Sequence, residues 1–154
     1  MAIVQTAGAR LYIADPGAIV ASPDPWTEVG EIASLGEFGR VYNEVTSEAI
    51  NDRKVRKFKG TYNDGSLAIT LNRDPSDAGQ ADLISALDDT ISDYNFRIEF
   101  DDDDPDGGGS LPTRIVFKAK VLSYTTNLQG PGNMIQSTCT LSIQSGSIVE
   151  TPAA

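Results

Sequence analysis

The 154-residue sequence contains no histidine and only one cysteine, Cys139. Histidine is the commonest general base and the usual zinc ligand, and one thiol forms neither an internal disulfide nor a metal cluster. Serine–histidine triads and zinc sites are therefore excluded. No Gly-Lys-Ser or Gly-Lys-Thr phosphate loop occurs, and Gly36 and Gly39 are too close together for a dinucleotide-binding motif. Carboxylates are plentiful, but nothing selects an acid–base pair, so we predict a protein that is not an enzyme and needs no cofactor.

Long apolar runs and a surplus of positive charge are also missing. No stretch approaches the roughly 18 apolar residues of a membrane helix, and the first six residues lack the basic start of a secretory signal, so we expect folding in the cytoplasm. The net charge of −10 argues against general nucleic-acid binding, which needs cations to neutralise phosphates. The length predicts a single domain over 1–154, with an N-terminal arm over 1–25 and a C-terminal tail over 150–154.

Alternating apolar and polar residues predict β-strands along most of the chain. Short strands are expected over 26–39, and longer ones over 40–50, 66–72, 94–100, 114–125 and 135–144, the last with Cys139 as a small buried hydrophobe. Residues 75–90 carry an apolar stripe at helical spacing, and Asp74 with Pro75 is the expected helix start. About six or seven strands and one helix predict a mainly β fold, a β-sandwich or open barrel flanked by an α-helix.

The most unusual stretch is a basic limb at residues 53–59. It holds five of the twelve cationic residues: Arg53, Lys54, Arg56, Lys57 and Lys59. The turn-forming run Tyr62–Ser66 follows, and we expect it to close a hairpin whose returning strand covers Leu67 to Leu71. The basic limb could be a solvated strand edge, a nucleic-acid contact, or a surface that meets carboxylates of another copy. Because the rest of the chain is acidic, self-association is the favoured interpretation.

An acidic run, Asp101–Asp106, invites a calcium interpretation. Asp102, Asp104, Asp106 and Gly107 fall at four positions of the calcium-loop pattern. Pro105 interrupts that pattern, and Thr113 stands where a bidentate Glu is required. We therefore expect a solvated acidic loop and no metal site.

Several segments, in their order and spacing, resemble the major tail tube proteins of long-tailed, non-contractile (siphovirus-type) bacteriophages. The resemblance runs from about Trp26 to Val149, and it rests on Trp26–Ile32, Val45–Ser47, Phe58–Gly65, Leu71–Gln80, Tyr94–Ile98, Phe117–Val121 and a closing strand through Ile143. It implies the tail-tube fold. It further implies subunits that form hexameric rings, stack into a hollow tube and join their hairpins into a continuous inner β-barrel.

The resemblance also implies a function and partners. The chain would be a structural virion protein of the tail, assembled in the host cytoplasm, that encloses the tape-measure protein and conducts the genome at ejection. Tail terminator and tail tip proteins would meet the tube ends, DNA would pass transiently through the lumen, and no membrane would take part.

The residues that the resemblance singles out fall into two groups. The basic limb matches the region that reaches neighbouring subunits, so its five cations are interface candidates. Candidates for the lumen, or for ion pairs with the basic limb, are Glu44 and Glu48, and a polar strand face that is equally well an ordinary outer face offers Gln136, Thr138 and Thr140. The alternative from another class is a monomeric β-sandwich module that binds carbohydrate or calcium.

Overall fold

The computed structural model describes residues 5–17, 26–102 and 112–152, which form ten β-strands and one α-helix. The elements in chain order are β1 (Arg10–Ala14), β2 (Thr27–Val29), β3 (Ile32–Ser34), β4 (Val41–Ser47), β5 (Arg56–Asn63), β6 (Ser66–Asn72), α1 (Ala78–Asp88), β7 (Tyr94–Glu99), β8 (Arg114–Asn127), β9 (Gln136–Ile143) and β10 (Val149–Thr151). The mainly β prediction with one helix is confirmed. The strands outnumber the six or seven expected, because β2, β3 and β10 have three residues each and are too short to show alternation.

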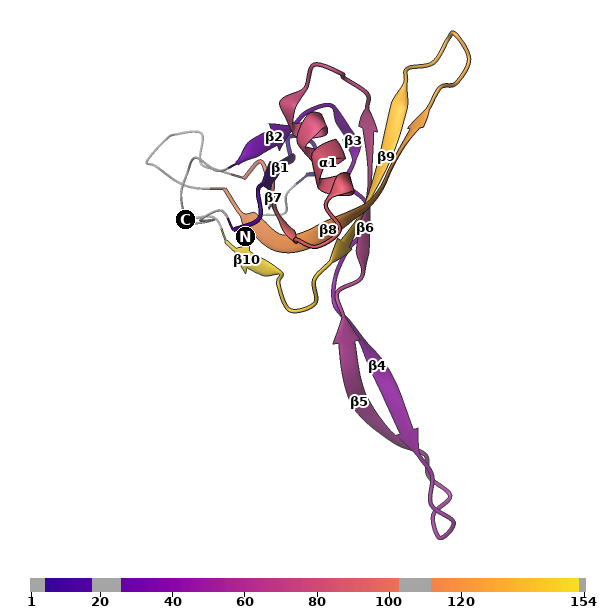
Figure 1. Ribbon diagram of the computed structural model, residues 1–154. Helices are drawn as coiled ribbons and strands as arrows, with labels where there is room; N and C mark the ends of the chain where they lie inside the picture. Colours follow the sequence, from indigo (N-terminus) through magenta and orange to yellow (C-terminus); the bar gives the residue numbers. More distant parts are fainter. Residues whose placement is uncertain (1–4, 18–25, 103–111, 153–154) are drawn as a thin grey trace.

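Eight strands form one sheet in the order β2-β1-β7-β8-β9-β6-β3, with β10 paired to β8, and the pairs within it are antiparallel. The sheet curves strongly, and α1 packs against β8, β2 and β1 on the side that holds the core (Figure 1). The remaining two strands, β4 and β5, form a separate two-stranded sheet. None of the helices in the described ranges is long and apolar enough to cross a membrane.

Phe117 of β8 lies at the centre of the core. Its ring stacks on Phe96 of β7 and is tilted against Phe38, with 5.7 Å between ring centroids in each case. The inward faces expected for the sheet strands are confirmed, since the buried residues alternate along β6, β7, β8 and β9. Cys139 is fully buried, as expected, and this burial raises the pKa of its thiol to about 12. The thiol therefore stays protonated and acts as a small hydrophobe.

The helix begins one turn later than the sequence predicts. Asp77, not Asp74, is the N-cap: its carboxylate accepts hydrogen bonds from the backbone N–H of Gln80 at 3.0 Å and of Gly30 at 3.1 Å. Asp74 instead accepts bonds from the backbone N–H and the hydroxyl of Ser76, which hold the preceding residues in a turn. The cap thus also ties the helix to the connection between β2 and β3.

The buried face of the helix is also rotated from the expected stripe. Gly79, Gln80, Leu83 and Ala86 are buried, whereas Ala81 is exposed. A Cβ atom at Gly79 would lie 2.2 Å from the carbonyl oxygen of Glu28, so this glycine allows the helix to approach the backbone next to β2. Close backbone packing, more than the size of the apolar residues, therefore orients α1.

The prediction that Tyr62–Ser66 closes a hairpin is wrong. β5 pairs only with β4, while β6 pairs with β9 and β3, and β5 and β6 follow each other along nearly one line (Figure 1). The turn residues form a bend instead: Gly65 has a φ of 78°, and its N–H donates to the Asn63 side chain at 2.8 Å. The chain reverses at residues 48–55, between β4 and β5.

Two other segments are tied into the sheet more closely than the sequence suggested. β1, which lies in the stretch expected as an N-terminal arm, sits between β2 and β7 with Leu11 and Ile13 buried. β10, which overlaps the expected tail, pairs with the start of β8. Most of the acidic run lies outside the described residues, but the Asp102 carboxylate accepts bonds from the backbone N–H and the hydroxyl of Thr113, and these bonds lower its pKa. Within the described ranges, no group of three or more potential ligands is placed to hold a metal ion.

Candidate assembly surface

The two-stranded sheet of β4 and β5 projects from the body of the molecule (Figure 1). We call this hairpin, including its loop at 48–55, the ribbon. All seven residues of β4 and seven of the eight in β5 are exposed. At about 3.3 Å per residue, β5 spans roughly 26 Å. Neither strand pairs with a third strand in the described part of the chain. The ribbon therefore offers both faces and both edges to a partner.

The strand register divides the ribbon into an apolar and a polar face, because directly opposed residues share a face. Val45 lies opposite Phe58, and Ser47 lies opposite Arg56; with Val41 these residues define the apolar face. On the polar face, which the alternation places opposite, the cross-strand pairs are Tyr42 with Tyr62, Glu44 with Lys59, and Thr46 with Lys57.

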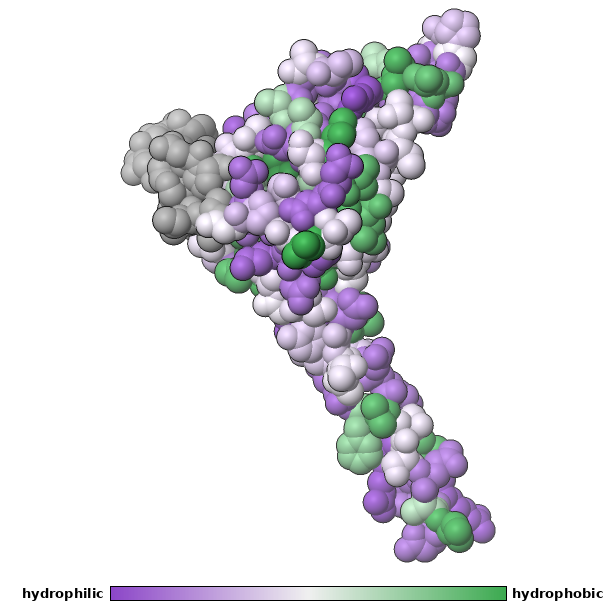
Figure 2. Space-filling view, viewed as in Figure 1, coloured by the Kyte–Doolittle hydropathy of each residue, from purple (hydrophilic) through white to green (hydrophobic). Residues whose placement is uncertain are grey.

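No core covers the apolar face. Val41 is 67% exposed, Val45 51% and Phe58 56%. The alternation expected over 40–50 is confirmed in β4. Such alternation is typical of a strand with one buried face, and that expectation is wrong for the single chain, since every β4 residue is exposed. Figure 2 shows hydrophobic groups along this projection, far from the body. An exposed apolar strip of this kind often marks a surface that a partner covers.

The polar face carries a ladder of cations and tyrosine rings. The Lys59 ammonium lies 4.0 Å from the centre of the Tyr42 ring, and the Tyr42 and Tyr62 rings are 5.3 Å apart. The Arg40 guanidinium lies 4.1 Å from the centre of the Tyr62 ring. These contacts stabilise the ribbon where it leaves the body, which matters because an isolated two-stranded hairpin is marginally stable in water.

A buried carboxylate fixes the base of the ribbon. Asp64 is fully buried, and its side chain accepts hydrogen bonds from the Gly146 backbone N–H at 2.7 Å and from Arg40 Nε at 3.1 Å. The backbone N–H of Asp64 donates to Ser145 Oγ at 3.3 Å. The hydrogen bond to Asp64 also raises the pKa of Arg40. We call Arg40, Asp64, Ser145 and Gly146 the base clamp; it connects the ribbon to the loop between β9 and β10.

The structure places the five cations of the basic limb along the ribbon but not on one face. Arg53 and Lys54 lie in the loop, with the backbone N–H of Lys54 bonded to Asp52 at 3.0 Å. Arg56 shares the apolar face with Phe58, and its guanidinium lies 3.6 Å from the Asp52 carboxylate. The two remaining cations, Lys57 and Lys59, belong to the polar face. The role of all five as interface residues stays a prediction.

The lumen or ion-pair candidates occupy two separate regions. Glu44 lies opposite Lys59 on the ribbon and Glu48 lies in the loop, and no salt bridge joins either one to the cations of the described ribbon. The other three lie on the outer face of β9 in the body, between polar residues of β8 and Ala68, Thr70 and Asn72 of β6: Gln136, Thr138 and Thr140. Their roles stay predictions.

Two features of the surface were missed in the sequence. The base clamp was hidden because Asp64 stands among turn residues, and its burial depends on the loop at Ser145 and Gly146, far away in the chain. The second feature is an apolar tip at the end of the β8–β9 hairpin, where Leu128 is 72% and Met134 73% exposed. The β8–β9 hairpin and the ribbon project from different ends of the body (Figures 1 and 2).

No protein-family model and no curated protein matches this chain. Among solved structures, it is similar to a chain of the anti-feeding prophage baseplate, with 13% identity over 99% of this chain and 98% of the other, and a TM-score of 0.71. It is similar to a chain of the sheath–tube complex of an extracellular contractile injection system, PVC, with 10% identity over 97% and 92% and a TM-score of 0.70. It is also similar to the SPP1 tail tube, with 12% identity over 97% and 80% and a TM-score of 0.63.

At these identities the similarity shows the fold, which is that of tail tube proteins. The same fold occurs in a contractile injection system and in the SPP1 tail tube. It therefore does not single out the non-contractile type that the sequence resemblance suggested.

Proposed function

We propose that this chain is the structural subunit of a hollow tail tube, which it builds by associating with copies of itself. The observation that carries the proposal is the ribbon: a fully exposed hairpin with an uncovered apolar face, on a fold shared over nearly the whole chain with proteins from tube-containing assemblies. Neighbouring copies would cover the apolar face and pair the open strand edges, which isolated sheets otherwise expose to aggregation.

In its finer form, the proposal has subunits in hexameric rings that stack into the tube of a virion tail assembled in the host cytoplasm. The tube would enclose a tape-measure protein, end at terminator and tip proteins, and conduct DNA at ejection. The structural similarity to the SPP1 tail tube, which covers 97% of this chain, supports this form. The non-contractile type remains the version proposed from the sequence.

Imaging of the purified chain tests the proposal. We expect rings or tubes in negative-stain images as the protein concentration rises, with light scattering reporting the assembled mass. The double variant Val45→Ser with Phe58→Ser should abolish these particles. It removes most of the apolar area whose burial between copies would favour assembly. Ile91→Ser is the matched control, since Ile91 is 85% exposed on the body and away from both faces of the ribbon. Monomers alone at every salt and protein concentration would contradict the proposal and favour a monomeric binding module.

We further propose that the outer face of β9 lines the lumen. Thr138 is exposed on this face, where its neighbours on β6 and β8 are Thr70 and Thr125. A Thr138→Cys variant should react with a bulky polymer maleimide as a monomer but not inside intact tubes. The native Cys139 is buried and would stay unmodified. Equal labelling before and after assembly would place this face on the outside of the tube.

A further inference from the structure

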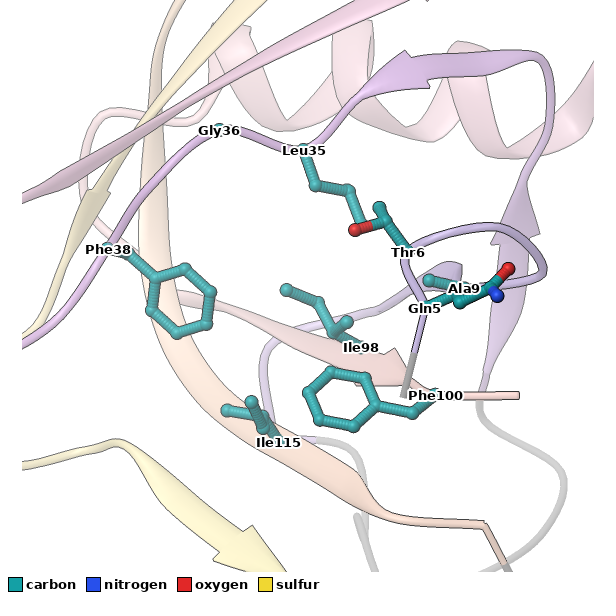
Figure 3. A pocket seen from close by; sticks show the side chains of 9 residues that line it. All are labelled: Gln5, Thr6, Ala9, Leu35, Gly36, Phe38, Ile98, Phe100 and Ile115. Atoms are coloured by element: carbon teal, nitrogen blue, oxygen red, sulfur yellow. The ribbon is translucent and has the colours of Figure 1, made fainter. Parts of the chain in front are cut away.

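An apolar groove opens beside the base of the ribbon. Its deeper part is a cavity of about 210 Å³. Figure 3 shows Phe38, Ile98, Phe100 and Ile115 gathered around this space, with Leu35 at its border. Ile98 and Ile115 belong to β7 and β8, Phe100 directly follows β7, and Leu35 and Phe38 lie in the segment that leads into β4. The groove is thus an extension of the core that remains open to solvent.

A second hollow continues the groove toward the ribbon. It shares Phe38 and Ile115 with the first cavity and is also lined by Ile148, Glu150, Arg40 and Asp64. Because Arg40 is paired with Asp64 in the base clamp, the remaining charge on this lining is the Glu150 carboxylate. Glu37 borders the adjoining hollow at Gly39 and Val41. The groove therefore has an apolar floor and an acidic rim.

The apolar face of the ribbon has the complementary chemistry. Val45 and Phe58 offer exposed apolar side chains, and Arg56 lies on the same face. Residues 40–63 contain six of the twelve cations but only three of the twenty-two carboxylates of the chain. The ribbon is thus basic and the body strongly acidic, so the two attract each other and copies of the same ribbon repel.

The ribbon cannot fill the groove of its own chain. The base clamp holds it at the rim, and from there it projects away from the body (Figure 1). We propose that the groove of one copy receives the apolar face of the ribbon of a second copy, with Phe58 and Val45 against Phe38, Ile115 and Ile148, and Arg56 beside Glu150. This proposal rests on the proposed self-assembly. It makes the contact heterologous, so that repeated copies form either a closed ring or an open stack, and both occur in the proposed tube.

A charge-exchange experiment tests the contact between Arg56 and Glu150. We expect Arg56→Glu and Glu150→Arg each to raise the protein concentration needed for half-assembly by about tenfold or more, because each places like charges together. Combining both changes should restore assembly to within about threefold of the original chain. Lys57→Glu is the matched control: Lys57 is one residue away but on the polar face, so Glu150→Arg should not rescue it. Equal rescue of both variants, or of neither, would overturn the proposed pairing.

Cross-linking gives a second test that does not depend on charge. Chains carrying Phe58→Cys are mixed with chains carrying Ile148→Cys and treated with a short bismaleimide. The native Cys139 should not react, because it is fully buried and the pKa of its thiol is about 12. We expect dimers that link the two variants, and at least about fivefold fewer when Lys57→Cys replaces Phe58→Cys, since the polar face points away from the groove.

The outcomes separate this proposal from the proposed function. Tubes that form normally without a cross-link between positions 58 and 148 would overturn the groove contact. The proposed function as a tube subunit would then still stand. Assembly that is unchanged by substitutions in the groove would likewise overturn the groove contact. A chain that never assembles would remove both proposals together.

Discussion

The body and the ribbon are built from the same alternating pattern, yet only the body is covered. In β9 the inward residues Cys139 and Leu141 are fully buried in the core. In β4, Val41 and Val45 occupy equivalent alternate positions and remain exposed. Alternation therefore determines which residues share a face, but it does not say whether the covering layer belongs to the same chain.

The comparison has a thermodynamic consequence. The body gains stability from burying apolar area within one chain, at roughly 25 cal/mol per Å². The ribbon gains little in this way and depends on its base clamp, on its ring contacts and, in the proposed tube, on a neighbouring copy. Changes in the body should therefore alter folding first, and changes on the apolar face of the ribbon should alter assembly first.

The largest expected contrast is between two phenylalanines. Phe117→Ala should lower the free energy of unfolding by about 3–5 kcal/mol, because it opens a cavity between Phe38 and Phe96. Phe58→Ala should change it by about 0.5 kcal/mol or less, since that ring is exposed. Urea denaturation of the monomer measures both values, and light scattering should show that Phe58→Ala raises the protein concentration needed for assembly. A large loss of monomer stability in Phe58→Ala would show that the ribbon folds back on its own body.

Much of the body could be predicted from the sequence because its signals are local. The inward faces of β7, β8 and β9 follow from alternation alone, and the helix follows from its apolar spacing. The faces of β4 were also predictable. The exposure of β4 could not be predicted. The sequence shows which side chains are apolar, but it does not show whether the same chain covers them.

The errors in the ribbon have a common cause. Asn63, Asp64 and Gly65 are typical hairpin residues, but the same conformations serve a bend between two strands that belong to different sheets. The distinction depends on the contacts of Asp64 with a loop about eighty residues later in the chain. Such contacts leave no local pattern. Likewise, the five neighbouring cations form one cluster in the sequence, but the pleat divides those on β5 between two faces.

The base clamp is where the two regions meet, and it should show a mixed, intermediate effect. Asp64→Ala should lower the free energy of unfolding by about 1–3 kcal/mol, because it removes the fully buried carboxylate that accepts hydrogen bonds from the Gly146 N–H and from Arg40. Arg40→Ala should also destabilise the fold, because it leaves the fully buried Asp64 carboxylate without its cation. Both variants should weaken assembly more than folding by freeing the direction of the ribbon. Thermal unfolding and light scattering measure the two effects; unchanged thermal unfolding in both variants would contradict the role of the base clamp.

The smallest expected effect belongs to the body alone. Burial raises the pKa of Asp82 on α1, and the nearby Asp15 carboxylate raises it further. A folded-state pKa above the unfolded one means that the charged form is disfavoured by folding, so stability from this group is present at low pH and is lost as pH rises through the folded pKa. Asp82→Asn should therefore raise Tm at pH 7, with a gain that shrinks toward pH 4. Asp88→Asn, at an exposed position on the same helix, controls for net charge. Asp82 lies on α1 in the body and not on the ribbon, so assembly should not change. Altered assembly in Asp82→Asn would place α1 in the contact between copies.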